Sequence, residues 1–145
     1  PWDAPRVTVA GRELSLDDIE HRILRVDFDE PRIHFALNCA SVSCPPLDAR
    51  AYRAEDLDAH LDAVTLRALN ADDWLDASGC PGAYGSGEIR VSKIFDWFAD
   101  DFGGEAGIRA FLAEFRPDLR FRLANTGCSL EAMDYDWSLN EQPEQ

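Results

Sequence analysis

No part of the chain constrains its fold more than residues 31–47, whose sequence is PRIHFALNCASVSCPPL. Between Ile33 and Asn38, apolar side chains alternate with polar or small ones, which is typical of a strand with two unlike faces. The alternation places His34 and Asn38 together on the polar face and puts the next residue, Cys39, on the apolar face. We therefore predict that this segment is a strand within a small sheet, followed by a short loop that ends in Cys-Pro-Pro.

The composition limits the kinds of partner that the chain can have. Its 145 residues are 46% hydrophobic, which is enough for a single globular domain, residues 1–145, with a buried core. Fourteen basic and 28 acidic residues give a formal charge of −14. Nucleic acids bind to cationic surfaces, so no nucleic-acid partner is expected. No apolar run approaches the roughly 20 residues that span a bilayer, so no membrane span is expected either.

The remaining patterns predict an α+β fold, with a small sheet and about four helices. Apolar residues recur at helical spacing in four segments, which are residues 16–25, 54–70, 93–102 and 105–115. Ser15 and Ser92 stand where helix N-caps are expected. Further short strands are predicted near Val7, at residues 88–91 and at residues 119–123, where leucine and phenylalanine alternate with arginine. Between the second and third helices, residues 72–87 carry four glycines and are expected to form a long loop.

Four cysteines allow three complete disulfide pairings. Cys80 lies in the glycine-rich loop and Cys128 in loop-like sequence, so we predict a disulfide between them, with a stabilisation on the order of 3 kcal/mol. Cys39 is expected to stay reduced and buried, as a free cysteine on an apolar face usually is.

The leading functional hypothesis is a cysteine-dependent hydrolase or acyl transferase that acts on a small molecule or peptide. Cys44 is the candidate nucleophile because the proline after it suits the first position of a helix, whose dipole favours a thiolate. His34 is the candidate base, and Glu20 or Asn38 would orient its imidazole. The two prolines after Cys44 weaken the hypothesis, since they lack the N–H groups that an oxyanion would use. No cofactor is expected.

Two other hypotheses stand beside this one. In the first, the chain is a non-catalytic binding or interaction domain, for example for a protein partner, and the loop with its histidine and cysteines is structural. In the second, His34, Cys39 and Cys44 hold a metal ion, since the gap between the cysteines lies in the range of zinc loops. A fourth ligand would then have to come from a distant position, namely His21, His60 or Asp136.

Seven segments occur in an order that points to a known family: 15–25 (SLDDIEHRILR), 33–39 (IHFALNC), 43–47 (SCPPL), 51–52 (AY), 93–97 (KIFDW), 101–102 (DF) and 135–140 (YDWSLN). Together they resemble the family catalogued as domain of unknown function 547, over about residues 7–140. The family has no assigned activity, so the resemblance implies none.

The family's bacterial members often look exported, which implies an extracytoplasmic location, periplasmic or secreted. Its members usually carry an upstream helix with Trp-Ile-Asn and Tyr-Asn patterns. That helix is absent here, which implies a fragment of a longer protein.

Overall fold

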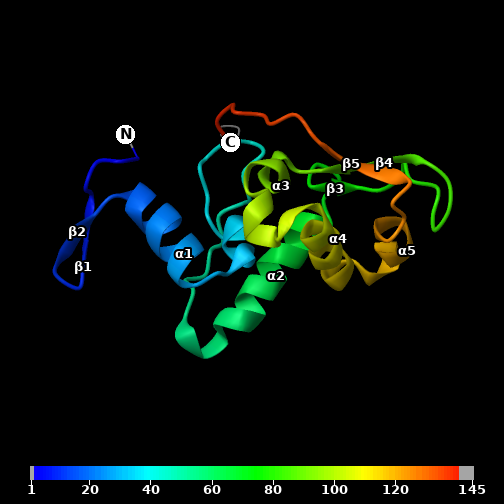
Figure 1. Ribbon diagram of the computed structural model, residues 1–145. Helices are drawn as coiled ribbons and strands as arrows, with labels where there is room; N and C mark the ends of the chain where they lie inside the picture. The colour runs from blue at the N-terminus through cyan, green and yellow to red at the C-terminus, as the bar shows by residue number, and fades with distance from the viewer. Residues whose placement is uncertain (1, 141–145) are drawn as a thin grey trace.

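The computed structural model describes residues 2–140 and combines helices with two small sheets (Figure 1), so the predicted α+β class is confirmed. The strands are short: β1 (Val7–Val9), β2 (Arg12–Leu14), β3 (Leu75–Asp76), β4 (Gly87–Val91) and β5 (Cys128–Ala132). The α-helices are α1 (Arg25–Asp27), α2 (Leu57–Leu69), α3 (Lys93–Trp97), α4 (Gly104–Phe115) and α5 (Arg120–Leu123). A π-helical segment, η1 (Asp18–Leu24), precedes α1, and the 3-10 helices are η2 (Pro31–Phe35), η3 (Ala54–Asp56), η4 (Ala99–Phe102) and η5 (Pro117–Leu119).

The two sheets lie at opposite ends of the molecule in Figure 1. The hairpin β1-β2 is antiparallel and projects beyond α1. In the other sheet the order is β3-β4-β5, with β4 antiparallel to β3 and parallel to β5. Parallel neighbours need a crossover connection, and here the chain passes through α3, α4 and α5 between β4 and β5. Among the described residues, no helix combines the length and apolarity needed to cross a membrane.

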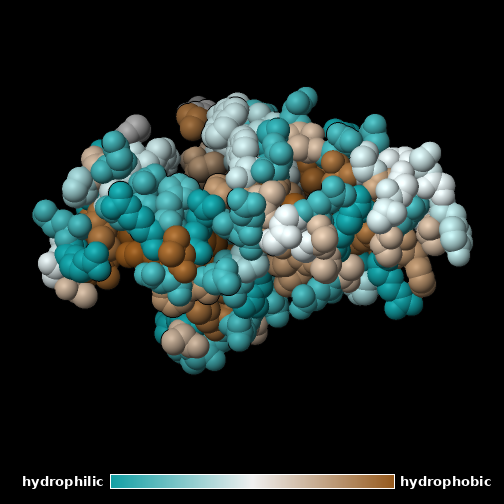
Figure 2. All heavy atoms as spheres, viewed as in Figure 1, coloured by the Kyte–Doolittle hydropathy of each residue, from teal (hydrophilic) through white to brown (hydrophobic). Residues whose placement is uncertain are grey.

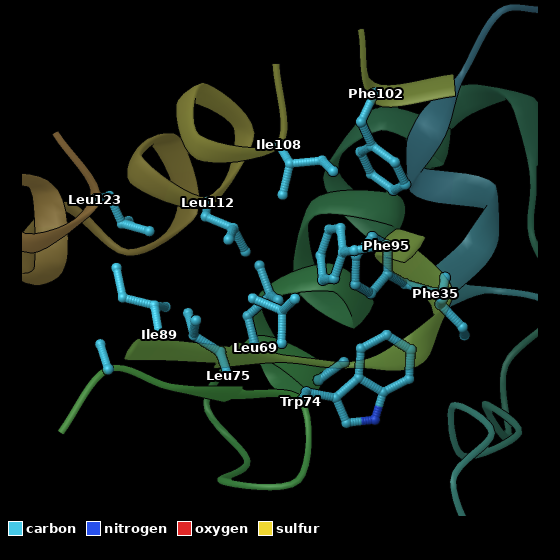
Figure 3. Packing of buried hydrophobic residues seen from close by; sticks show 14 of the residues in the cluster. Phe35, Leu69, Trp74, Leu75, Ile89, Phe95, Phe102, Ile108, Leu112 and Leu123 are labelled. Carbon is cyan, nitrogen blue, oxygen red and sulfur yellow. The ribbon is translucent and has the colours of Figure 1, made fainter. Parts of the chain in front are cut away.

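The core lies between the three-stranded sheet and the helices (Figure 3). Phe35 enters it from η2 and packs against Trp74, with 5.2 Å between the ring centroids. Leu69 of α2 and Leu112 of α4 are completely buried in the same cluster. Burial of Phe35 therefore attaches the 31–47 stretch to the core of the protein. Hydrophilic side chains cover much of the face seen in Figure 2, and hydrophobic ones form separate patches there.

All four predicted helical segments are confirmed, although three of them change helix type along their length. The Ser15 hydroxyl accepts a hydrogen bond from the Asp18 N–H (2.9 Å), and the Ser92 hydroxyl accepts one from the Ile94 N–H (3.4 Å), so both expected caps are present. Gly103 separates η4 from α4 with a φ of 82°, a left-handed conformation that glycine adopts without strain.

The strand predicted for Ile33 to Asn38 is wrong, because the chain there forms the 3-10 helix η2. Pro31 suits the first helical turn, and the Glu30 carboxylate caps it by accepting a hydrogen bond from the Arg32 N–H (3.0 Å). Residues 33, 34 and 35 are all buried, so the alternating pattern did not correspond to two different faces.

The strand predicted over residues 119–123 is also wrong, since this segment forms η5 and α5. Leu119 and Leu123 are four residues apart and both turn inward, whereas Phe121 between them is exposed. A period of two and a helical repeat cannot be told apart over so few residues.

The predicted disulfide between Cys80 and Cys128 is confirmed, and their Cα atoms lie 5.9 Å apart. The Asn125 amide beside it donates hydrogen bonds to the carbonyls of Gly82 and Gly85, which fastens the long loop between β3 and β4. The other two cysteines are free. Cys39 was expected to be buried, and this is wrong: it is exposed, because it follows a helical turn rather than lying on the inner face of a strand.

Replacing Cys80 and Cys128 together by Ala should lower the free energy of unfolding by about 4 kcal/mol. The bridge closes a segment of 48 residues, which restricts the unfolded chain. Urea denaturation followed by tryptophan fluorescence measures the change. The control is Cys39→Ala, which removes an exposed thiol and should change stability by less than about 0.5 kcal/mol. Equal stability of the double variant and the wild type would contradict the bridge.

Candidate functional site

The loop after η2 is closed by the side chain of Asn38. Its amide donates to the Pro45 carbonyl (2.7 Å), and its side-chain oxygen accepts from the Ala40 N–H (2.9 Å). Ala40 itself has a φ of 63°, a left-handed conformation that is uncommon for alanine and marks a sharp turn. These contacts bring the two ends of the loop together, and with them Cys39 and Cys44.

The C-terminal part of the chain runs along this loop. Ser41 and Leu139 form an isolated antiparallel bridge, the Val42 N–H donates to the Ser138 carbonyl (2.9 Å), and the Asn140 N–H donates to the Ala40 carbonyl (2.8 Å). In Figure 1 this red segment crosses from β5 back towards the cyan loop. The pairing places Tyr135 over the loop, although nearly a hundred residues separate the two in sequence.

Cys39 and Cys44 form a pair of unlike thiols. Cys39 is exposed, whereas Cys44 is 6% exposed. The Cys39 N–H donates to the Cys44 sulfur (2.8 Å), and the Cys44 thiol is 3.7 Å from the Leu37 carbonyl, to which it donates. The two thiols are also close enough for each to change the pKa of the other.

The surroundings move the pKa values of the two thiols in opposite directions. Burial raises the pKa of Cys44 to about 11, and the neighbouring Cys39 thiolate adds to the increase. Burial also acts to raise the pKa of Cys39, but the neighbouring polar groups of Cys44, Ser41 and Tyr135 outweigh it, so that the pKa of Cys39 is lowered. Cys39 is therefore the thiol that ionises first, and it is the one that solvent reaches.

Two hydroxyl groups contact the Cys39 sulfur, and one of them belongs to a cluster of three aromatic rings. The Ser41 and Tyr135 hydroxyls lie 3.1 and 3.3 Å from it, and Ser41 also donates to Tyr135 (3.0 Å). The Tyr135 ring packs against Trp97 and Trp137, and the three centroids are between 4.5 and 5.4 Å apart. We call these three residues the aromatic cluster.

His34 lies in a separate network. Its Nε2 donates to the Asp101 carboxylate (2.8 Å), which also accepts two hydrogen bonds from Arg25 (2.6 and 2.9 Å). The His34 ring stacks on Phe98 with 4.2 Å between centroids, and burial lowers the pKa of His34, which Asp101 offsets in part. Neither of the residues proposed to orient the imidazole makes a hydrogen bond to it. Asn38 closes the loop instead. The pKa of Arg25 is raised mainly by its hydrogen bond to Asp101, and the nearby charge of Glu20 adds to this increase.

The structure thus brings Cys39 and Cys44 together but not the expected Cys44 and His34. Within residues 2–140, no hydrogen bond joins His34 to either thiol. That part of the chain also contains no group of three or more histidine, cysteine or acidic side chains that could hold a metal ion. His60, one of the distant ligands considered, instead pairs with Asp48.

Sequence reasoning missed Asp101, Ser41 and Tyr135. Asp101 and Tyr135 belong to segments of the family resemblance, but nothing in a single sequence connects them to residues 31–47. Ser41 stands between the cysteines, where a hydroxyl is a potential hydrogen-bond donor to sulfur. The closeness of Ser41 to both cysteines in the sequence was the one local signal that pointed to any of these three residues.

Replacing Asp101 by Ala should lower the free energy of unfolding by about 2–3 kcal/mol, because it leaves a largely buried Arg25 and His34 without their shared acceptor. The pH dependence of Cys39 alkylation should stay that of the wild type. Asp100→Ala, an exposed neighbour, is the control and should change neither quantity. A shifted alkylation profile in Asp101→Ala would connect the His34 network to the thiols and contradict its separation.

Comparison with known proteins gives one family. Residues 2–67 match the model of a family described as "Protein of unknown function, DUF547". The match includes the loop with both thiols and ends before α3 and the aromatic cluster. No curated protein and no solved structure matches the chain. The resemblance to the domain of unknown function 547 is therefore confirmed over residues 2–67, and it assigns no activity.

Proposed function

We propose that the loop of Cys39 and Cys44 is a thiol–disulfide exchange centre, in which Cys39 attacks the substrate and Cys44 resolves the mixed disulfide. The observation that carries the proposal is the contrast within one loop: an exposed thiol with a lowered pKa touches a buried thiol with a raised one. The thiolate is the attacking species in disulfide exchange, and the best attacking thiols have a pKa near the ambient pH.

The exchange needs only these two thiols and a substrate disulfide. The Cys39 thiolate forms a bond to one substrate sulfur and breaks the substrate S–S bond, and the departing thiolate takes up a proton. The Cys44 thiolate then forms a bond to the Cys39 sulfur, breaks the mixed disulfide and releases the second substrate thiol, which is protonated in turn. The substrate gains two electrons and two protons, and the protein loses them as it forms the Cys39–Cys44 disulfide. A low-molecular-weight thiol would restore the reduced pair.

The backbone geometry supports formation of this disulfide. The 2.8 Å contact between the Cys39 nitrogen and the Cys44 sulfur limits the distance between the two Cα atoms to about 7 Å, since one bond separates the first Cα from that nitrogen and two separate the second from that sulfur. Disulfides join Cα atoms that are about 4.4–6.8 Å apart. The bond requires rotation of the side chains, with little movement of the backbone.

The hydrolase or acyl transferase hypothesis receives less support from the same geometry. Its nucleophile, Cys44, is buried with a pKa raised to about 11, and its base, His34, is occupied by Asp101. At Cys39 the nearest groups are two hydroxyls and the second thiol rather than an imidazole. Burial first and Cys39 second raise the pKa of Tyr135, so it serves as a hydrogen-bond donor and not as a base.

An extracytoplasmic location forms part of the proposal. The disulfide between Cys80 and Cys128 supports it, because structural disulfides persist in oxidising compartments and are rare in the cytosol. Exchange chemistry fits a compartment in which protein disulfides form and need correction.

Alkylation with iodoacetamide should separate the two thiols. Cys39 should react at pH values below the ordinary thiol pKa of about 8.5, because its thiolate is stabilised, whereas Cys44 should react slowly until the pH approaches its pKa of about 11. Mass spectrometry of the digested protein, sampled at a series of pH values, follows both sites at once. A lower apparent pKa at Cys44 than at Cys39 would reverse their roles.

Removal of the Tyr135 hydroxyl should weaken the activation of Cys39. In Tyr135→Phe the thiolate loses one hydrogen bond, so alkylation of Cys39 near pH 7 should slow roughly two- to tenfold. The control is Tyr84→Phe, which removes the hydroxyl of an exposed tyrosine in the loop between β3 and β4. An unchanged alkylation rate in Tyr135→Phe would show that this hydrogen bond has no influence on the thiol.

Trapping should identify the attacking thiol directly. Incubated with hydroxyethyl disulfide, Cys44→Ser should accumulate a mixed disulfide at Cys39, since no second thiol is present to resolve it. Cys39→Ser should accumulate almost none, and the wild type should pass on to the Cys39–Cys44 disulfide. Intact-mass measurement distinguishes the three products. If both thiols stay reduced in the wild type, the loop is structural and the non-catalytic hypothesis holds.

A further inference from the structure

Beside the proposed exchange centre lies an exposed aromatic surface that the thiol chemistry does not itself require. In the aromatic cluster, Trp97 is 43% exposed and Trp137 is 67% exposed, while Tyr135 is half-buried between them and the loop. The Tyr135 hydroxyl contacts the Cys39 sulfur, so the surface is continuous with the reactive atom. Solvent-exposed indole rings near a reactive group are suited to contact with a substrate.

The residues next to the aromatic cluster in the sequence carry mainly negative charge. Asp134 and Asp136 flank Tyr135 in the sequence and both are exposed, and Asp96 precedes Trp97. The nearest basic side chain in this part of the sequence, Lys93, is paired with Asp96 (2.6 Å). The carboxylates therefore exceed the basic groups here, as they do in the whole chain, whose formal charge is −14.

Resting on the proposed exchange function, we propose that the aromatic cluster docks the substrate, and that the substrate is a polypeptide disulfide flanked by Lys or Arg. Cationic side chains bind to the faces of Trp and Tyr rings and are drawn to nearby carboxylates, so both features of this surface select the same partner. An anionic disulfide would be repelled by the same carboxylates.

The test compares three disulfide-linked peptide dimers that differ only in the residues next to cysteine: Lys, Ser or Glu. Each is mixed with the reduced wild-type protein, and quenched samples are analysed by mass spectrometry for oxidation of Cys39. Flanking charge also alters the intrinsic reactivity of a disulfide. Every rate is therefore divided by the rate of the same peptide with 2-mercaptoethanol, a neutral thiol.

We expect the normalised rate of the Lys peptide to exceed that of the Ser peptide roughly tenfold at low salt, and the Glu peptide to be the slowest. Salt should narrow the difference, since it screens exposed charges. Trp97→Leu with Trp137→Leu should lose most of the preference. Tyr84→Leu, which removes a more exposed ring from the loop between β3 and β4, should keep it.

The outcomes separate the two proposals. Equal normalised rates for all three peptides would overturn the docking proposal and leave exchange at Cys39 intact. A preference for Lys that survives the double tryptophan substitution would overturn the role of the aromatic cluster. If none of the peptides oxidises Cys39 while iodoacetamide still alkylates it, the exchange function itself fails, and the docking proposal fails with it.

Discussion

One carboxylate holds two neighbouring segments near the start of the chain against a third that is distant in the sequence. Asp101, in η4, accepts hydrogen bonds from Arg25 of α1 and from His34 of η2, and Phe98 stacks on the imidazole beside it. Removing Asp101 would leave the buried Nε2 of His34 without its partner, which is far more costly than never forming the pair. This contact holds η2 against η4 together with the burial of Phe35, and the thiol loop begins where η2 ends.

This arrangement explains why His34 is a poor catalytic base in spite of its position. Its imidazole is 3% exposed, its Nε2 is bonded to Asp101, and its ring covers an aromatic side chain. The histidine contributes by fixing the start of the loop, and the reactive chemistry is left to the two sulfurs beyond it. A histidine close to a cysteine in sequence is therefore weak grounds for a catalytic pair, because one helical turn is enough to direct the two side chains to different places.

Local signals predicted the helices well, and contacts between distant residues determined what could not be predicted. Apolar spacing together with Ser15 and Ser92 located helices that the structure contains. The alternation in residues 33–38 failed because burial of Ile33, His34 and Phe35 comes from tertiary packing, which overrode a short pattern. The loop and its cysteines were recognised as the candidate site, but Cys44 was preferred to Cys39. The proposed role of Cys39 rests partly on its contact with Tyr135, and no local pattern in the sequence reveals that contact.

Because the C-terminal segment returns to the loop, the surroundings of Cys39 are completed only late in the synthesis of these residues. A ribosome makes Cys39, Cys44, Cys80 and Cys128 before it makes Tyr135, so all four thiols emerge before the hydroxyl that activates one of them. Until residues 135–140 have folded back, Cys39 lacks the Tyr135 hydrogen bond, which lowers its pKa less than the nearby Cys44 and Ser41 do. Cys80 and Cys128 are therefore both available to form their bridge before the environment of Cys39 is complete.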